Sequence, residues 1–418
     1  MKFLLAIGII AIIALIGSRV SFHNRSLPLG IRHILFTGTE YIFIGVLLGE
    51  WGLNLLDGET LLQLESIMLF CLAWIGLLFG LQFEIRLLQR LPKYYFSITA
   101  IQSSITFVLV ASASYLMMTG FSLLPDHMIG LVALVLGAMS ACTAQSAIAI
   151  VNKNYRIQNR QLLELMRYIA GVDGVFALLF FAIALSLSPL TNLTESYTVY
   201  AIARWLLVSI VIGVIPGMLF VALSKTRFSN QEFTLFLVGT ILFCGGLAQQ
   251  LHYSPLFSGM VCGFLTANLC RHRLRAIQIV AHAEKSIYIL LLLIVGAYWE
   301  LSLGTGLMIG IGYFSVRLTG KFLGALLATR VFRPQYEVPS IIGLGLISEG
   351  GLAIAIVLNF HYLFPSIADV LITVIVFSVI LNELLSPRLI MAQFKPGDIN
   401  LRTRKNQTSE HRINNDDS

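Results

Sequence analysis

The sequence predicts an all-α polytopic membrane protein with about thirteen transmembrane helices. Of its 418 residues, 57% are hydrophobic and only 12% are charged, whereas soluble proteins have about 25% charged residues. Apolar runs of about 20 residues, each long enough to cross a bilayer, recur along the chain. The runs do not alternate between polar and apolar residues, as the strands of a transmembrane barrel would.

Polar breaks divide the apolar runs into thirteen predicted helices. Their approximate ranges are 3–17, 34–53, 62–81, 94–118, 128–151, 164–187, 198–222, 233–251, 255–270, 282–299, 303–329, 338–358 and 366–391. The first run resembles a signal peptide, but no small-residue cleavage site follows it, so we expect an uncleaved first helix. Because the connections are short, residues 1–394 form one transmembrane domain. Residues 395–418 are a polar, aperiodic tail that we expect to be disordered.

Loop charges predict the orientation of these helices in the membrane. The loops after the odd-numbered helices hold sixteen Lys and Arg residues, and the loops after the even-numbered helices hold none. By the positive-inside rule, the N-terminus lies outside and the C-terminus lies in the cytoplasm. We expect the membrane to be a bacterial-type inner membrane. The same bias explains the net charge of +7, so the basic residues do not indicate a nucleic-acid partner.

Two of the predicted helices are interrupted by glycine and small polar residues. Residues 137–152, GAMSACTAQSAIAIVN, and residues 343–359, GLGLISEGGLAIAIVLN, both place such residues before an apolar A-I-A-I-V run. The helices that contain them are seven apart, so they cross the membrane in opposite directions. Interrupted helices at corresponding positions of two inverted halves indicate a transporter binding site. Chance similarity between apolar segments is the alternative explanation.

The first interrupted helix holds four polar side chains, Ser140, Thr143, Gln145 and Ser146. Hydroxyls in helices often bond back to carbonyls of the preceding turn, which is the structural alternative. Unwound backbone at membrane depth is tolerated where it lines a cavity. Its free carbonyls and nearby hydroxyls would offer oxygen ligands to a small cation such as Na⁺ or K⁺.

Within the predicted helix 164–187, the apolar stretch 168–187 contains a single charged residue, Asp173. It lies about 10 residues from the basic loop, or about 15 Å, which is half of a bilayer core of about 30 Å. A carboxylate at that depth is costly and is usually functional, because poor solvation allows it to exchange a proton for a cation. A buried Asp that pairs with a basic residue for assembly is the structural alternative.

Other deep polar residues are candidates for support of this acid. The second interrupted helix holds Ser348 and Glu349, and three roles stay open for Glu349: cation binding, an ion pair, or complementing the broken helix ends. Lys285, Arg317 and Lys321 are the deep basic residues, any of which might neutralise one of the acids. Arg317 is mid-span and suits a structural ion pair, whereas Lys321 could extend toward the cytoplasmic interface.

Signatures of enzymes and of metal centres are absent from the sequence. The five cysteines lie in apolar segments without a CxxC pair and are interpreted as small core residues. No HExxH, P-loop or GxSxG motif occurs. We therefore expect no enzymatic activity, no cofactor and no metal beyond a transported monovalent cation.

Several segments together resemble the monovalent cation:proton antiporter superfamily, in its sodium/proton exchanger and potassium-efflux antiporter branch. The similarity includes YIFIGVLLGEWGLNLL with the following MLFCLAWIGLLFGLQFEIRLL, and GAMSACTAQSA, which is similar to an unwound family segment close to A-T-S-x-A. It also includes the acid Asp173 and the segments SPLFSGMVCGFLTANL and ISEGGLAIAI. It covers nearly all thirteen helices.

The resemblance implies an inverted-repeat fold with a dimerisation domain, a mobile core domain and two half-unwound helices that cross beside the essential acid. It also implies a homodimer and elevator-like alternating access. The family usually has a polar residue before this acid, but here Val172 precedes Asp173. A single acid suggests one-for-one, electroneutral exchange, and the identity of the cation stays open.

The sequence thus predicts a secondary antiporter that exchanges H⁺ for Na⁺ or K⁺, with Asp173 binding proton and cation alternately. Thr143, Ser146 and Gln145 are the expected cation-site neighbours, and the lipid bilayer is the expected surrounding. A cation channel is one alternative, although no selectivity-filter motif is visible. A transporter of another solute on the same fold is a second. A membrane enzyme or a sensor is disfavoured, because the loops and the tail are too short for an interfacial site or an output domain.

Overall fold

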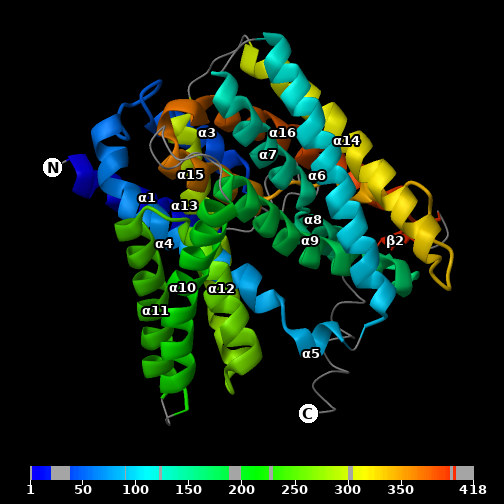
Figure 1. The fold of residues 1–418 in the computed structure, drawn as a ribbon, viewed down its shortest axis with the longest axis horizontal. Helices are drawn as coiled ribbons and strands as arrows, with labels where there is room; N and C mark the ends of the chain where they lie inside the picture. Colours follow the sequence, from blue (N-terminus) through cyan, green and yellow to red (C-terminus); the bar gives the residue numbers. More distant parts are fainter. Residues whose placement is uncertain are drawn as a thin grey trace.

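A computed structural model shows a protein built almost entirely of helices in its described part (Figure 1). It describes residues 2–19, 38–89, 91–121, 125–187, 199–225, 229–299, 305–395 and 399–401. The first half contains α1 (Lys2–Arg19), α3 (Glu40–Leu48), α4 (Gly58–Gln82), α5 (Ile85–Leu88), α6 (Lys93–Phe121), α7 (Asp126–Ala141), α8 (Gln145–Asn154) and α9 (Arg160–Ser186). The second half contains α10 (Val199–Leu223), α11 (Asn230–Leu251), α12 (Pro255–Leu269), α13 (Arg273–Tyr298), α14 (Thr305–Phe332), the 3₁₀ helix η1 (Ile342–Leu346), α15 (Gly351–Leu363) and α16 (Pro365–Met391).

The helices are those of a multi-pass membrane protein. Among the described residues, eight helices are long and apolar enough to cross a membrane, and the segments Lys2–Gly17, Pro255–Leu269 and Gly351–Leu363 are shorter apolar helices. Each of the thirteen predicted ranges contains at least part of one helix. The ranges 128–151 and 338–358 each contain two, because the chain leaves the helical conformation inside them, as the interrupted sequences predict.

The helices form two packing groups. In the first, α4 packs on α12, α12 on α10, and α13 on α3, and α10, α11 and α12 lie side by side in green at the lower left of Figure 1. In the second, α6 packs on both α14 and α7, α7 packs on α9, and α14 packs on α16. The cyan α6 and the yellow α14 run next to each other on the right of Figure 1.

Glycines allow α4 and α12 to approach each other at backbone distance. A Cβ added to Gly76 would lie 2.0 Å from the carbonyl oxygen of Leu256, and one added to Gly263 would lie 2.2 Å from that of Leu77. Both helices repeat glycine four residues apart, which is the small-residue spacing of close membrane helix pairs. This contact makes α4 and α12 a rigid part of the first group.

The end of the chain departs from the prediction of a disordered tail. Residues Ile399–Leu401 form strand β2, which pairs antiparallel with β1 (Tyr155–Ile157) in the connection between α8 and α9. The strand is only three residues long, so the polar and aperiodic sequence gave no periodic signal for it. Residues 396–398 and 402–418 of the predicted tail lie outside the described residues.

Candidate functional site at the helix crossing

The two interrupted helices meet at their non-helical segments. Helix α7 ends at Ala141 and α8 begins at Gln145, and Cys142 and Ala144 between them have extended backbone. On the other side, η1 ends at Leu346 and α15 begins at Gly351. The backbone N–H of Ala144 donates to the carbonyl of Ser348 at 2.9 Å. The predicted crossing of two half-unwound helices is therefore confirmed.

Close approach at the crossing requires a glycine. A Cβ added to Gly350 would lie 2.8 Å from the Cβ of Ala144, so a larger residue would push the two segments apart. The broken backbone also leaves carbonyl and N–H groups without partners in their own helices, and these groups need other partners when they are buried. Two buried basic residues on α14 donate to the carbonyls, and Asp173 on α9 accepts from one of the N–H groups.

Asp173 on α9 lies against the first of these segments and is completely buried. Its Oδ1 accepts from the backbone N–H of Thr143 at 3.1 Å, and its Oδ2 accepts from the Thr143 hydroxyl at 2.5 Å. The ammonium of Lys321 on α14 lies 3.2 Å from the same Oδ2. The carboxylate thus faces one positive charge and two neutral donors at the crossing.

Lys321 is also completely buried and uses its full hydrogen-bonding capacity there. Besides Asp173, its ammonium donates to the carbonyl of Ala141 at 2.6 Å and to the Thr143 hydroxyl at 2.9 Å. The expectation that Lys321 extends toward the cytoplasmic interface is therefore wrong. Burial of its charge is offset by the ion pair and by the free carbonyl at the end of α7, which an interfacial position would not provide.

A second charged cluster joins both broken segments. Arg317, one helical turn before Lys321 on α14, donates to the carbonyl of Cys142 at 2.9 Å and to the carbonyl of Ile347. Its Nε lies 3.6 Å from Oε1 of Glu349. Of the three roles left open for Glu349, the ion pair with a basic residue is the one present in the structure. One guanidinium therefore bonds to both non-helical segments and fixes their separation.

Glu349 is further held by neutral donors from two helices. Tyr313 on α14 donates to Oε1 at 2.8 Å, and Ser378 and Asn382 on α16 donate to Oε2, the latter at 3.0 Å. Both carboxylate oxygens thus have donors, as a buried charge requires. This network has the properties of a structural support for the crossing.

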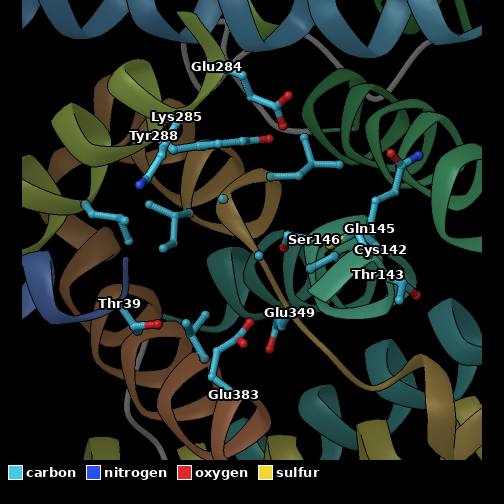
Figure 2. Close-up of a pocket in the computed structure, with 18 of the residues that line it drawn as sticks. Thr39, Cys142, Thr143, Gln145, Ser146, Glu284, Lys285, Tyr288, Glu349 and Glu383 are labelled. Atoms are coloured by element: carbon cyan, nitrogen blue, oxygen red, sulfur yellow. The ribbon is translucent and has the colours of Figure 1, made fainter. Parts of the chain in front are cut away.

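A cavity of about 400 Å³ opens beside the crossing. One wall comes from the two broken helices and α16, with Thr143, Gln145 and Glu383, and the opposite wall comes from α13, with Glu284 and Lys285 (Figure 2). Thr143 lines the cavity and also bonds to Asp173, so it lies between the open space and the buried acid. Thr143 therefore belongs both to the cavity wall and to the contacts of Asp173.

Comparisons with known proteins agree with this architecture. Residues 4–390 match the family model for the transmembrane domain of sodium/hydrogen exchangers. The chain belongs to the sodium/hydrogen exchanger family. Comparison with curated protein sequences gave no match.

Two solved structures of a sodium proton antiporter have a fold similar to that of this chain. A structure of the sodium proton antiporter MjNhaP1 from Methanocaldococcus jannaschii at pH 8 superposes with a TM-score of 0.65 at 17% identity, covering 94% of this chain and 99% of that one. A second structure of the same antiporter, from electron microscopy, gives 0.62 at 15% identity, covering 95% and 100%. At these identities the likeness establishes the fold.

The predicted site residues of this exchanger-family chain all line the cavity, but they differ in their contact with the acid. Thr143 bonds directly to Asp173, whereas Gln145 and Ser146 have no recorded bond to it. The amide of Gln145 donates to Gln82 at 3.3 Å on the exposed side of α8. The reason is that α8 begins at Gln145, so the chain turns into a new helix immediately after Thr143.

The structure also shows where the predicted supporting residues Ser140, Lys285 and Ser348 lie. Ser140 donates to the carbonyl of Gly137 at 2.6 Å, the local bond that was the structural alternative for this hydroxyl. Lys285 lines the cavity from α13, and Ser348 donates to Oε1 of Glu383 on α16 at 3.1 Å. The bond from Ser348 connects the second broken segment to a buried acid.

Glu383 is a residue that sequence reasoning missed. It is almost completely buried and lines the cavity. A signal was present, because Glu383 interrupts the apolar run 366–391 in the same way that Asp173 interrupts its own. The depth argument applied to Asp173 would have selected it too.

Proposed function

We propose that this chain exchanges H⁺ for a monovalent cation, Na⁺ or K⁺, across the inner membrane by alternating access. Its membership of the sodium/hydrogen exchanger family supports cation:proton antiport in general terms, as does the fold it shares with a sodium proton antiporter. The observation that supports the specific mechanism is the position of Asp173. It is a fully buried carboxylate at the point where two broken helices cross, in contact with one ammonium and one hydroxyl.

Competition for this carboxylate couples the two flows in the proposed cycle. A cation that reaches Asp173 replaces the Lys321 ammonium at Oδ2, because two positive charges cannot share one carboxylate oxygen at low cost. The Thr143 hydroxyl and the carbonyls of Ala141 and Leu346, which already face this point, would supply further oxygen ligands. A proton bound to Asp173 removes the negative charge and so excludes the cation.

This scheme predicts the stoichiometry. If Lys321 keeps its proton throughout, one carboxylate is neutralised either by one proton or by one cation, and the exchange is one-for-one and electroneutral. If Lys321 releases its proton when the cation displaces it, two protons move per cation and the exchange carries current. We propose the first case, in keeping with the single acid of this apolar stretch, Asp173, which Val172 precedes.

The cavity is the proposed entry path. Lys153, at the end of α8, lines it, and the loop that follows α8 is one of the basic loops of the positive-inside pattern. On that orientation, with the N-terminus outside and the C-terminus inside, the cavity opens to the cytoplasm. We propose that the described conformation faces inward and that the protein works as a homodimer, as the family resemblance implies.

Transport by purified protein in liposomes tests the proposal. An imposed pH gradient should drive uptake of Na⁺ or K⁺, and each added cation should drive proton movement in return. Asp173→Asn should abolish both flows, whereas the matched change Asp369→Asn, at an exposed position on α16, should leave them intact. Cation-driven proton movement that persists in Asp173→Asn would refute the mechanism.

The same assay separates the alternatives. A channel would pass cations without a counter-flow of protons and at rates far above carrier turnover. A carrier of another solute would move protons only when that solute is present. Clamping the membrane potential with valinomycin and K⁺ tests the stoichiometry, because electroneutral exchange of Na⁺ should not respond to the imposed potential.

A further inference from the structure

A second hollow, distant in sequence from the helix crossing, lies where α11 and α13 begin. It has a volume of about 660 Å³ and is lined by basic residues of the α12–α13 connection, Arg271, His272, Arg273 and Arg275, with Asn230 and Gln278 on the helices beside it. The antiport mechanism uses none of these residues. Three arginines at alternate positions around one hollow create a strongly positive surface.

The three arginines differ in their contacts. Arg275 donates to the carbonyl of Ser229 at 2.7 Å, and its guanidinium lies 4.5 Å from the centre of the Phe233 ring. Arg273 forms an ion pair with Glu84 at 2.9 Å. Arg271 is exposed, and we find no ion-pair partner for it in the described part of the chain. Among the described residues, the carboxylates near these three guanidinium groups are Glu84, which pairs with Arg273, and Glu232, which accepts from the N–H of Ser229, so positive charge is in excess at the hollow.

The backbone adds to this positive field. Helix α13 is 26 residues long, and its N-cap His272 makes no side-chain capping bond. Helix α11, which begins beside it, has instead a complete capping box from Ser229 and Glu232. The uncapped N–H groups and the positive dipole end of α13 favour an anion with oxygen acceptors, and phosphate is the common example.

Apolar surface continues from the hollow along the membrane-facing side. Leu274 on α13 is 68% exposed, and Leu235 and Phe236 on α11 are 72% and 38% exposed. Helix α11 is itself long and apolar enough to cross the membrane. A free phosphate would use only the positive hollow, whereas a phospholipid would use both surfaces.

We propose that this hollow binds the phosphate headgroup of an anionic phospholipid, with acyl chains along α11. The positive-inside rule explains why a cytoplasmic loop is basic, but it requires neither a hollow nor an uncapped helix start. Basic pockets between membrane helices on the cytoplasmic side suit anionic headgroups. The proposal concerns lipid binding alone and does not depend on the antiport mechanism.

Lipid retention by the full chain tests the proposal. Protein purified in detergent is titrated with phosphatidylglycerol, with phosphatidylcholine, or with inorganic phosphate, and bound lipid is counted by native mass spectrometry. Phosphatidylglycerol should bind in preference to phosphatidylcholine. Arg271→Gln should weaken its binding about fivefold, the usual effect of one basic residue at a membrane surface, and Gln278→Glu, which adds a carboxylate to the hollow, should weaken it further.

Arg86→Gln, at an exposed position on α5, is the matched control and should bind phosphatidylglycerol like the unmodified chain. Equal binding of the two lipids, or equal binding by Arg271→Gln and Arg86→Gln, would overturn the proposal. Inorganic phosphate that binds in an Arg271-dependent manner while phosphatidylglycerol does not would also overturn it, in favour of a soluble phosphate. Normal thermal unfolding of Arg271→Gln without lipid shows that the variant is folded.

Discussion

Replacing Lys321 with methionine removes the buried ammonium at the crossing but keeps most of the side-chain volume. Three hydrogen bonds are lost, to Ala141, Thr143 and Asp173. Asp173 keeps only its two neutral donors from Thr143 in a site with no exposure to solvent. Removing one partner of a buried ion pair costs about 3–5 kcal/mol, chiefly because the other charge is left uncompensated. We expect a loss of that size in the free energy of unfolding.

A double-mutant cycle isolates the pair from the rest of this cost. Asp173→Asn alone leaves the Lys321 ammonium unpaired and should also destabilise by several kcal/mol, about 3–5 by the same reasoning. In the double variant neither charge remains, so its loss should fall short of the sum of the single losses by about 2–3 kcal/mol. The assay is reversible unfolding in mixed detergent micelles.

Arg330→Met is the matched control, because it removes an exposed basic residue from the same helix. Arg330 lies nine residues beyond Lys321, or about 14 Å along α14, so its combination with Asp173→Asn should be additive within about 0.5 kcal/mol. Additive losses for Lys321→Met and Asp173→Asn would refute the reasoning, because they would mean that the two charges do not stabilise each other.

Four further predictions follow from other contacts. Arg317→Lys keeps the charge but loses the paired bonds to both broken segments. The free energy of unfolding in the same assay should therefore fall by about 1.5–3 kcal/mol, and an unchanged value would contradict this support role. Thr143→Val should raise the cation KM in liposomes about tenfold, in line with the loss of one hydrogen bond of about 1.5 kcal/mol. Thr143→Ser keeps the hydroxyl and should not raise the KM. If both variants change the KM equally, the hydroxyl is excluded as a ligand. Glu383→Gln removes a negative charge from the cavity wall and should raise the cation KM more at low than at high ionic strength; a salt-independent change would point to packing instead. The Asp57 carboxyl accepts from Thr60 at the start of α4, which lowers the pKa of this carboxyl. Asp57→Ala should therefore lower the thermal stability at pH values above the ordinary carboxyl pKa, and make no difference once pH falls below the pKa of the folded state. A loss of stability that does not change with pH would exclude the charged cap.

The interrupted helices illustrate how far the sequence predicts the site. The segments GAMSACTAQSA and ISEGG marked both breaks, and the apolar run around Asp173 placed the acid near the middle of the membrane. That the acid lies beside the breaks was implied by the family resemblance alone. However, the polar pattern could not distinguish Thr143 from Gln145 and Ser146. All three line the cavity, and the structure distinguishes Thr143 as the residue that also bonds to Asp173, because it lies in the break itself and α8 starts only at Gln145.

The pairing of charges shows where sequence reasoning stops. Three deep basic residues and two deep acids allowed several combinations, and the structure selects Lys321 with Asp173 and Arg317 with Glu349. Glu383, a third buried acid, which accepts from Ser348 of the second broken segment, was not among the acids considered. Each of these pairings depends on which helix faces are brought together, and apolar sequence contains little information about that.

By itself, the sequence determined that the chain is a multi-pass helical membrane protein, where its spans lie, which two helices are broken and which acid lies deep. These properties depend on the free-energy cost of placing polar and charged groups in hydrocarbon. Each residue contributes to that cost locally, so the sequence alone is enough to predict them. Only the tertiary structure decided the partners of the acid, the cavity beside it and the basic hollow at the start of α13. Asp173 and Lys321 are 148 residues apart, and an ion pair forms only when packing brings two such residues within a few ångströms of each other.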